Sequence, residues 1–399
     1  MKQSQPALYS LLSALLISLV FGTACKDGSR NTASGRLDIE ELEPVSSWPA
    51  AAWPESKPEA EGMDTAALQK LAEYTFQKTG PDSERKGIRS DALVIIRNGK
   101  LVYEKYDRNY TKDSRHLIWS ISKSFVNALY GIAVQEGRLK IDYPAAQYYK
   151  ALDTSDKRSM TLRHILNMSS GIYWQEDYEY APLKSSVVAM LYTRGRDDMA
   201  AFTARQEMRT EPGQYLYYSS GDSNLLMGIL KNVLKAEYDE YPWQKLFAVL
   251  GMQTAVWERD ASGTFVGSSY IYCSARDLAR FGYLYLADGI WQNRRLLPEG
   301  WVDFTRTPAP AHTTTLDNDE LLEYQMTAQW YSNLDIPNSR YSAPWPDAPR
   351  DTFAGLGHWG QRLFVIPSLN MIVVRFGDDR DGSFNINTFL KLVKDSVQQ

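Results

Sequence analysis

Ser120 and Lys123 are the two residues of this 399-residue chain whose types and spacing most directly suggest chemistry. They stand near the start of an apolar run, residues 118–129, that predicts a helix ending at Gly137. Residues three apart share one face of a helix, so the amine can reach the hydroxyl. A serine becomes a nucleophile beside a base, and a lysine becomes that base when burial or neighbouring cations lower its pKa. The free N–H groups of the first turn, including that of Ser120, can also stabilise an oxyanion.

The tetrapeptide Ser-x-x-Lys is short, and the sequence contains it twice. Its other occurrence, from Ser83 to Lys86, lies in the charged run of residues 81–86, where nothing apolar would bury the lysine. An exposed lysine keeps its ordinary pKa and stays protonated at neutral pH. The prediction of a nucleophile therefore rests on Ser120 and its apolar surroundings.

The order of three motifs resembles the serine β-lactamase and penicillin-binding-protein superfamily. Ser-x-x-Lys at Ser120 is followed about a hundred residues later by Tyr218, and a His-x-Gly motif at His358 lies near the end of the chain. More narrowly, the chain resembles the class C β-lactamase-related group, which also holds esterases, D-aminopeptidases and 6-aminohexanoate-dimer hydrolases. Taken alone, Tyr218 would pass for one core tyrosine among 25.

Further stretches of the sequence carry the same resemblance, which extends from about residue 60 to residue 399. The family's LLxHTSG segment is similar to residues 161–171, and its PG…YSN…LLG segment to residues 211–228. Its DLARFG helix is similar to residues 274–282, and its last motif before the final hairpin to residues 355–361.

The resemblance implies a role for each of three residues. Ser120 would attack a carbonyl group and become acylated. Lys123 would keep the hydroxyl activated and share protons with Tyr218, which would protonate the leaving group and assist deacylation. A phenol has a pKa near 10, so this role leads us to expect a neighbouring cation that lowers it.

The resemblance also implies substrate-binding residues. His358, Trp359 and Gly360 would occupy a final strand beside the nucleophile, and Gly360 would let the substrate backbone approach closely. The N–H of Gln361 would pair with that of Ser120 as the oxyanion hole. His358 takes a place often held by lysine, so its charge would depend on pH.

Two departures from the family pattern bear on the substrate. The Tyr-x-Asn motif ends here in Ser220, so the amide that would hold a lactam side chain is missing, and Lys-Thr-Gly is replaced by His-Trp-Gly. Both changes favour a 6-aminohexanoate-dimer hydrolase-like amidase or an esterase acting on a small molecule or peptide. A class C-type β-lactamase, a D-amino-acid peptidase and an acylatable sensor without turnover remain alternatives. The acidic and aromatic residues 173–180 would either bind a substrate amino group or form a solvated loop.

Several other function classes lack support in the sequence. No Gly-x-Ser-x-Gly elbow is present, and the four histidines are scattered without zinc-ligand spacing. The net charge is −4 with no basic stripe, so we expect no nucleic-acid partner. We expect neither a metal nor another cofactor.

The elements that must position these residues follow from the hydrophobic pattern. Asn98-Gly99 between two apolar runs predicts a hairpin, residues 362–376 predict two more strands, and a final helix carries Phe389. Residues 118–290 are mainly helical, with turns at 153–157, 168–171 and 210–223. We therefore expect an α+β fold of the β-lactamase/transpeptidase-like type, with an antiparallel sheet from both termini flanked by helices and an inserted helical lobe.

The first sixty residues predict export. Residues 1–24 read as a signal peptide, with Lys2, an apolar stretch and small residues before Cys25. Cys25 could be lipidated, although Gly22 also suits ordinary signal-peptidase cleavage. Residues 25–60 would form a tether and residues 61–399 the hydrolase domain. The protein would be periplasmic or an outer-membrane-anchored lipoprotein, and with Cys25 lipidated only Cys273 would remain, so we expect no intrachain disulfide.

Overall fold

The computed structural model describes residues 42, 45, 47–78, 80–178 and 181–398. These residues belong to one folded unit, residues 37–399. The predicted signal peptide, Cys25 and the first part of the predicted tether lie outside the described residues, as do Glu179 and Tyr180. In the part of the chain that the structure describes, no helix is long and apolar enough to cross a membrane.

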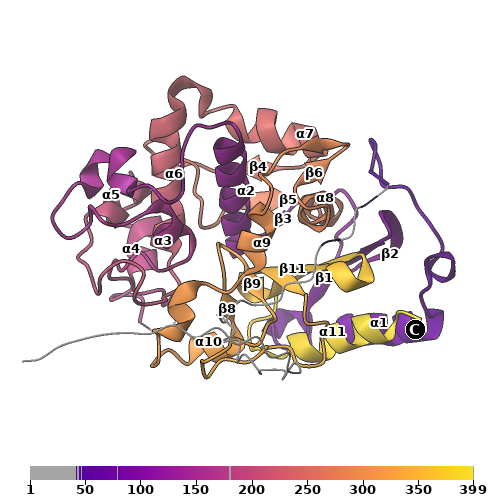
Figure 1. The fold of residues 1–399 in the computed structure, drawn as a ribbon. Helices are drawn as coiled ribbons and strands as arrows, with labels where there is room; N and C mark the ends of the chain where they lie inside the picture. Colours follow the sequence, from indigo (N-terminus) through magenta and orange to yellow (C-terminus); the bar gives the residue numbers. More distant parts are fainter. Residues whose placement is uncertain (1–41, 43–44, 46, 79, 179–180, 399) are drawn as a thin grey trace, which may run out of the picture. The chain divides into compact units, whose positions relative to one another are not determined.

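A seven-stranded antiparallel sheet forms one half of the fold, in the order β2-β1-β12-β11-β10-β9-β8 (Figure 1). Strand β12 near the C-terminus pairs with β1 near the N-terminus, which confirms the predicted sheet from both termini. Asn98 and Gly99 both have positive φ, as a two-residue type I′ turn requires. The strands of this sheet are β1 (Ser90–Arg97), β2 (Lys100–Tyr106), β8 (Gln325–Met326), β9 (Tyr331–Ser332), β10 (Phe353–Gly357), β11 (Gln361–Ile366) and β12 (Met371–Gly377).

Both faces of this sheet are buried under helices. In β1, Leu93 and Ile95 pack with α1 (Thr65–Thr75) and α11 (Ile386–Asp395), which lie side by side below the sheet in Figure 1. Val94 and Ile96 point the other way, into the core shared with α8 (Ala275–Leu286). Burial on both faces explains why β1, β11 and β12 read as continuous apolar runs.

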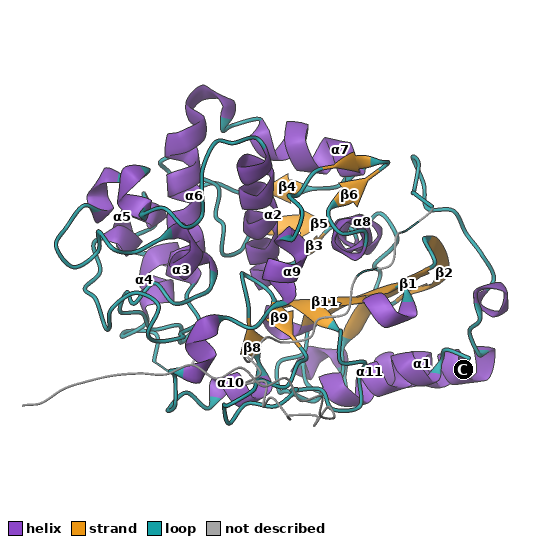
Figure 2. Ribbon diagram, in the orientation of Figure 1, coloured by secondary structure: helices purple, strands orange, loops and turns teal. Residues whose placement is uncertain are grey.

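The helical lobe lies beside the sheet, as Figure 2 shows, and its central helix is α2. The helices of the lobe pack around α2 and α6. They are α2 (Ser122–Gln135), α3 (Leu162–Leu166), α4 (Ser186–Tyr192), α5 (Met199–Ala204), α6 (Ser220–Leu234) and α7 (Ala248–Leu250).

The lobe is mainly helical, as predicted, but two of its details differ from the sequence analysis. The region contains a small three-stranded sheet, in the order β3-β5-β4, because residues 256–257 and 271–273 return to pair beside residues 116–117. The predicted turn at 210–223 ends earlier, since the Ser219 side chain accepts the N–H of Asp222 and starts α6 at Ser220. The short strands are β3 (His116–Leu117), β4 (Val256–Trp257) and β5 (Ile271–Cys273).

The remaining elements connect the lobe back to the sheet. They are β6 (Ile290–Trp291), β7 (Arg294–Arg295), α9 (Trp301–Arg306) and α10 (Glu320–Glu323). The last part of the predicted tether packs onto the domain: Trp53 is buried in the core, and the N–H of Leu101 in β2 bonds to the carbonyl of Pro54. This part of the segment is therefore an arm of the fold.

Candidate active site

Ser120 lies in a short 3-10 turn, Trp119–Ile121, that runs directly into α2. The sequence predicted Ser120 inside the first turn of the α-helix, so the position is one turn earlier than expected. The turn is fixed from both sides, because Ile118 donates its N–H to the carbonyl of Ile271 and the N–H of Ile271 bonds to the Ser122 hydroxyl. Trp119 is held at positive φ, a conformation that bulky residues avoid and that is common at functional sites.

Lys123 reaches back from the first turn of α2 and is buried, with 2% of its surface exposed. Its Nζ lies 3.1 Å from the Ser120 Oγ, 3.1 Å from the Ser220 Oγ and 3.0 Å from the Ser268 carbonyl oxygen. Burial lowers the pKa of Lys123 to about 8, and the negative charge of Glu176 opposes this change. The predicted contact between amine and hydroxyl is present, and a substantial fraction of the amine is neutral near pH 8.

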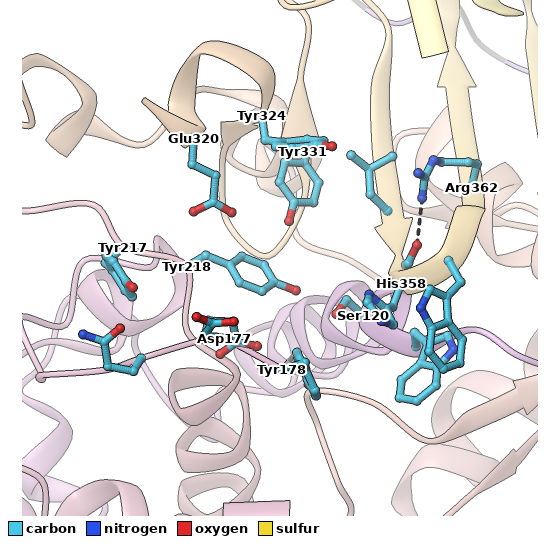
Figure 3. Close-up of a pocket in the computed structure, with 16 residues that line it drawn as sticks. Ser120, Asp177, Tyr178, Tyr217, Tyr218, Glu320, Tyr324, Tyr331, His358 and Arg362 are labelled. Carbon is cyan, nitrogen blue, oxygen red and sulfur yellow. Dashed lines mark hydrogen bonds between the residues drawn. The ribbon is translucent and has the colours of Figure 1, made fainter. Parts of the chain in front are cut away.

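Tyr218 enters the site just before α6, and Figure 3 shows its phenol pointing toward Ser120. The Lys123 Nζ stands 4.7 Å from the centre of the Tyr218 ring. Enclosure by protein, with Tyr331 and Glu176 close by, raises the pKa of Tyr218 well above its usual value, although contact with the Ser120 hydroxyl opposes the rise. The expectation that a cation lowers this pKa is therefore wrong: the phenol stays protonated and is a proton donor at neutral pH.

Ser120 opens into a cavity of about 700 Å³ between the helical lobe and the sheet. Figure 3 shows Glu320 and Tyr217 toward one end of this cavity and His358 and Arg362 toward the other, with Ser120 between them. A smaller recess behind Ser120 is lined by Lys123, Tyr218 and Leu356, among others. The geometry therefore brings the three residues predicted from the sequence to one cleft.

The His-Trp-Gly motif does not lie in a strand, as the sequence predicted, but in the turn His358–Gly360 between β10 and β11. His358 and Trp359 still line the cavity. Gly360 has a φ of 91°, and a Cβ there would collide with the Arg375 and Asp379 side chains, which form a buried ion pair. This glycine is thus explained by the packing behind the turn, with no need for an approaching substrate.

Gln361 likewise departs from its predicted place. It begins β11 and is 1% exposed, and its side-chain amide donates to the carbonyl of Gly377 at 2.7 Å. Gln361 is not among the residues that line the cavity, whereas Leu356 and Gly357 are. The strand that passes Ser120 is β10, where a Cβ on Gly355 would lie 3.1 Å from Ile121. The pair of glycines in Gly-Leu-Gly was the sequence signal for this close approach.

Ser220, predicted to bind substrate, is fully buried behind the cavity wall. Its hydroxyl accepts a hydrogen bond from Lys123 and donates one to Glu176. The predicted direct contact with substrate is therefore replaced by a place in the network behind the nucleophile.

Acidic side chains that the sequence did not single out as site residues line the cavity. Glu176 and Asp177 come from the loop of residues 173–178, and Glu320 from α10. Glu320 is open to solvent at the cavity mouth, yet the surrounding protein raises its pKa to about 7, helped by the charges of Glu176 and Glu323. The solvated-loop interpretation is thus wrong for Glu176, which accepts hydrogen bonds from Trp174 and Ser220 inside the protein, although its presence in an acidic and aromatic run was the signal.

Arg362 in β11 is a cation of this cavity that the sequence analysis missed. It donates to the carbonyl of Gly357 at 2.7 Å (Figure 3) and to the carbonyl of Gln361 at 2.9 Å. Burial lowers the pKa of its guanidinium. Within the described residues, no three His, Cys, Asp or Glu side chains gather in a way that could hold a metal ion.

Comparisons with known proteins identify the family and the fold of this chain. Residues 66–386 match the family model described as Beta-lactamase. The 6-aminohexanoate-dimer hydrolase of Paenarthrobacter ureafaciens is 25% identical over 297 residues, which cover 72% of each chain.

Solved structures share the fold of this chain at lower identity. The structure described as "Putative 6-aminohexanoate-dimer hydrolase from Bacillus anthracis" has a TM-score of 0.64 at 21% identity, covering 90% of this chain and 89% of the other. A family VIII carboxylesterase has a TM-score of 0.63 at 12% identity, covering 88% of this chain and 98% of the other. These likenesses define an α+β fold with an antiparallel sheet flanked by helices.

Proposed function

Because the chain belongs to the beta-lactamase family, we propose that it is a serine hydrolase that forms an acyl-enzyme on Ser120. The single observation that carries the proposal is the buried Lys123 amine, 3.1 Å from the Ser120 hydroxyl and shifted toward its neutral form. An amine of this kind is a competent base for a serine nucleophile.

The proposed reaction starts when Ser120 attacks a carbonyl carbon and its proton passes to Lys123. Collapse of the tetrahedral intermediate expels the leaving group, which takes the phenol proton of Tyr218, and Lys123 then returns a proton to the phenolate. Water attacks the resulting ester, its proton passes to the same groups, and Ser120 is released with its hydroxyl restored.

We assign the oxyanion hole to the N–H of Ser120 and an N–H of β10. In the described strands, β9 pairs with Phe353 and Ala354 of β10 and leaves the following residues at an open edge. Leu356 lies on that edge and lines the cavity beside Ser120, so its N–H replaces that of Gln361 as our candidate. Losing one such donor typically costs about 10²–10³ in rate.

The proposed substrate is an amide or ester of a small molecule or peptide. The similarity to a 6-aminohexanoate-dimer hydrolase supports a linear amide. The side chains of Glu176, Asp177 and Glu320 give the cavity an acidic wall that suits a substrate carrying an amino group. The serine at position 220 in place of asparagine disfavours a lactam.

A panel of substrates tests this proposal. Purified wild type and Ser120→Ala would be compared on p-nitrophenyl butyrate, a linear aminohexanoate dimer and nitrocefin, with mass spectrometry after a fluorophosphonate probe. We expect turnover of the ester or amide, a single covalent adduct on Ser120, and a loss of about 10⁴-fold or more in the variant. Labelling without turnover would favour an acylatable sensor. Preferred turnover of nitrocefin would favour a β-lactamase. If the wild type showed no labelling and no turnover, the proposal of an enzyme would be refuted.

We also propose that the protein is exported and held at a membrane through a lipidated Cys25. The support is the charged start, apolar stretch and cysteine of residues 1–25 followed by a polar tether. Intact mass of the mature protein from a bacterial host, with Cys25→Ala as the control, would distinguish a lipidated N-terminus from ordinary signal-peptidase cleavage. An uncleaved N-terminus would refute export.

A further inference from the structure

We propose that Glu176 is a positioning residue that, through the Ser220 hydroxyl, orients the Lys123 amine toward Ser120. The proposal rests on the proposed function, since it concerns the base that would activate Ser120. It concerns the geometry behind the nucleophile and holds for any acyl substrate.

The hydrogen bonds of Ser220 have a fixed direction. A carboxylate can only accept, so the proton of the Ser220 hydroxyl is committed to Glu176. The Ser220 oxygen then faces Lys123 with lone pairs, at 3.1 Å, and can only accept from the amine. Glu176 therefore decides which way this hydroxyl points.

The neutral Lys123 amine has fewer protons than hydrogen-bond partners. The neutral amine has two N–H groups and one lone pair, and it has three close partners. Ser220, as oriented by Glu176, and the Ser268 carbonyl both require a donor. The two N–H groups are thereby occupied, and the lone pair is left for the Ser120 hydroxyl, as general-base catalysis requires.

Glu176 is itself rigidly held. Besides the Ser220 hydroxyl, it accepts the backbone N–H of Ser220 at 2.9 Å and the indole N–H of Trp174. Trp174 is fully buried against the start of α6, where a Cβ on Gly221 would collide with its ring. The carboxylate thus sits at the N-terminus of a 15-residue helix, where the helix dipole attracts negative charge.

The charged and titratable groups around this carboxylate include Lys123, Tyr178, Tyr217, Tyr218, Asp222, Glu320 and Tyr331. Among the described residues, Lys123 is the cation of this group, and Glu176 is the acid whose charge raises the pKa of Lys123 against the effect of burial. Removing that charge must therefore lower the pKa of Lys123 further.

The test compares Glu176→Gln with Asp177→Asn, since Asp177 is the neighbouring acid that lines the same cavity, whereas Glu176 is the acid that accepts the hydrogen bonds of Ser220. The pH dependence of kcat/KM for p-nitrophenyl butyrate would be measured from pH 5 to 9.5, with circular dichroism to verify folding. For Glu176→Gln we expect kcat/KM at pH 8 to fall about tenfold or more, and the acidic limb to move about one unit toward lower pH. For Asp177→Asn we expect the limb to stay in place.

The shift of the acidic limb in Glu176→Gln separates positioning from a structural role. Loosening of the loop of residues 173–178 alone would lower kcat/KM without moving the acidic limb of its pH profile. An unshifted limb in Glu176→Gln, or an equal shift in Asp177→Asn, would overturn the inference. Should Glu176→Gln fail to fold, Ser220→Ala removes the hydroxyl that links Glu176 to Lys123 and keeps the Glu176 carboxylate. An unchanged kcat/KM in Ser220→Ala would refute the proposal. Failure of the proposed function is distinct, because wild type would then show neither turnover nor labelling of Ser120.

Discussion

The pH dependence of acylation is the sharpest prediction from this structure. Lys123 must be neutral to accept the Ser120 proton, and its pKa of about 8 means that roughly 1% of the amine is neutral at pH 6 and about half at pH 8. The acylation rate should therefore rise about 50-fold between these pH values. Below pH 7 the slope should be close to tenfold per pH unit.

The rate of Ser120 labelling by a fluorophosphonate probe measures this step without interference from product release. Intact-mass spectrometry at timed intervals, from pH 5 to 9.5 at constant ionic strength, gives the second-order rate constant. His358 also lines the cavity, and an ordinary imidazole has a pKa of about 6.5, so His358→Gln is the matched control and should retain the inflection near 8. Lys123→Ala should lose the pH dependence together with most of the rate.

Three outcomes would refute this reasoning. A profile that is flat between pH 6 and 8 would mean that Lys123 is not the base. An inflection near 10 would mean that its environment does not lower the pKa. Loss of the inflection in His358→Gln would assign the titration to the imidazole instead.

Three further predictions concern the leaving group, the turn after β10 and the acidic wall. Tyr218→Phe should lower kcat/KM for an amide by about 10²–10⁴-fold but far less for a p-nitrophenyl ester, whose leaving group needs no proton. The control Tyr324→Phe, in the same cavity, should leave kcat/KM for both substrates unchanged. Equal losses for the amide and the ester in Tyr218→Phe would refute the donor role. Gly360→Ala should lower the free energy of unfolding by about 2–4 kcal/mol, as measured by urea unfolding. The control Gly382→Ala should cost about 1 kcal/mol, because Gly382 also has a positive φ but open space around it. Equal losses in the two variants would exclude the clash. The KM for an amine-bearing substrate should fall as pH rises through about 7, where Glu320 becomes charged, and Glu320→Gln should abolish this trend. An unchanged trend in Glu320→Gln would show that Glu320 does not bind the amino group.

Much of the fold was readable from local pattern. The Asn98-Gly99 turn, the strands that form β11 and β12, and the helix that carries Phe389 all occur as predicted. These features depend on turn chemistry and hydrophobic period, which act over a few residues. Trp53 and the strand β5 were missed, because both gain their place from partners far along the chain.

The sequence by itself indicated the residues to which we assign the chemistry: Ser120 and Lys123 meet because residues three apart are separated by about one helical turn, and the order of the motifs pointed to Tyr218. Only the tertiary structure decided that β10 and not the His358 turn passes the nucleophile, because strand order is set by pairing across the whole sheet. It also decided that Ser220 faces Glu176 in the protein interior. A motif names residue types, whereas the direction of a side chain follows from packing between segments that are distant in sequence.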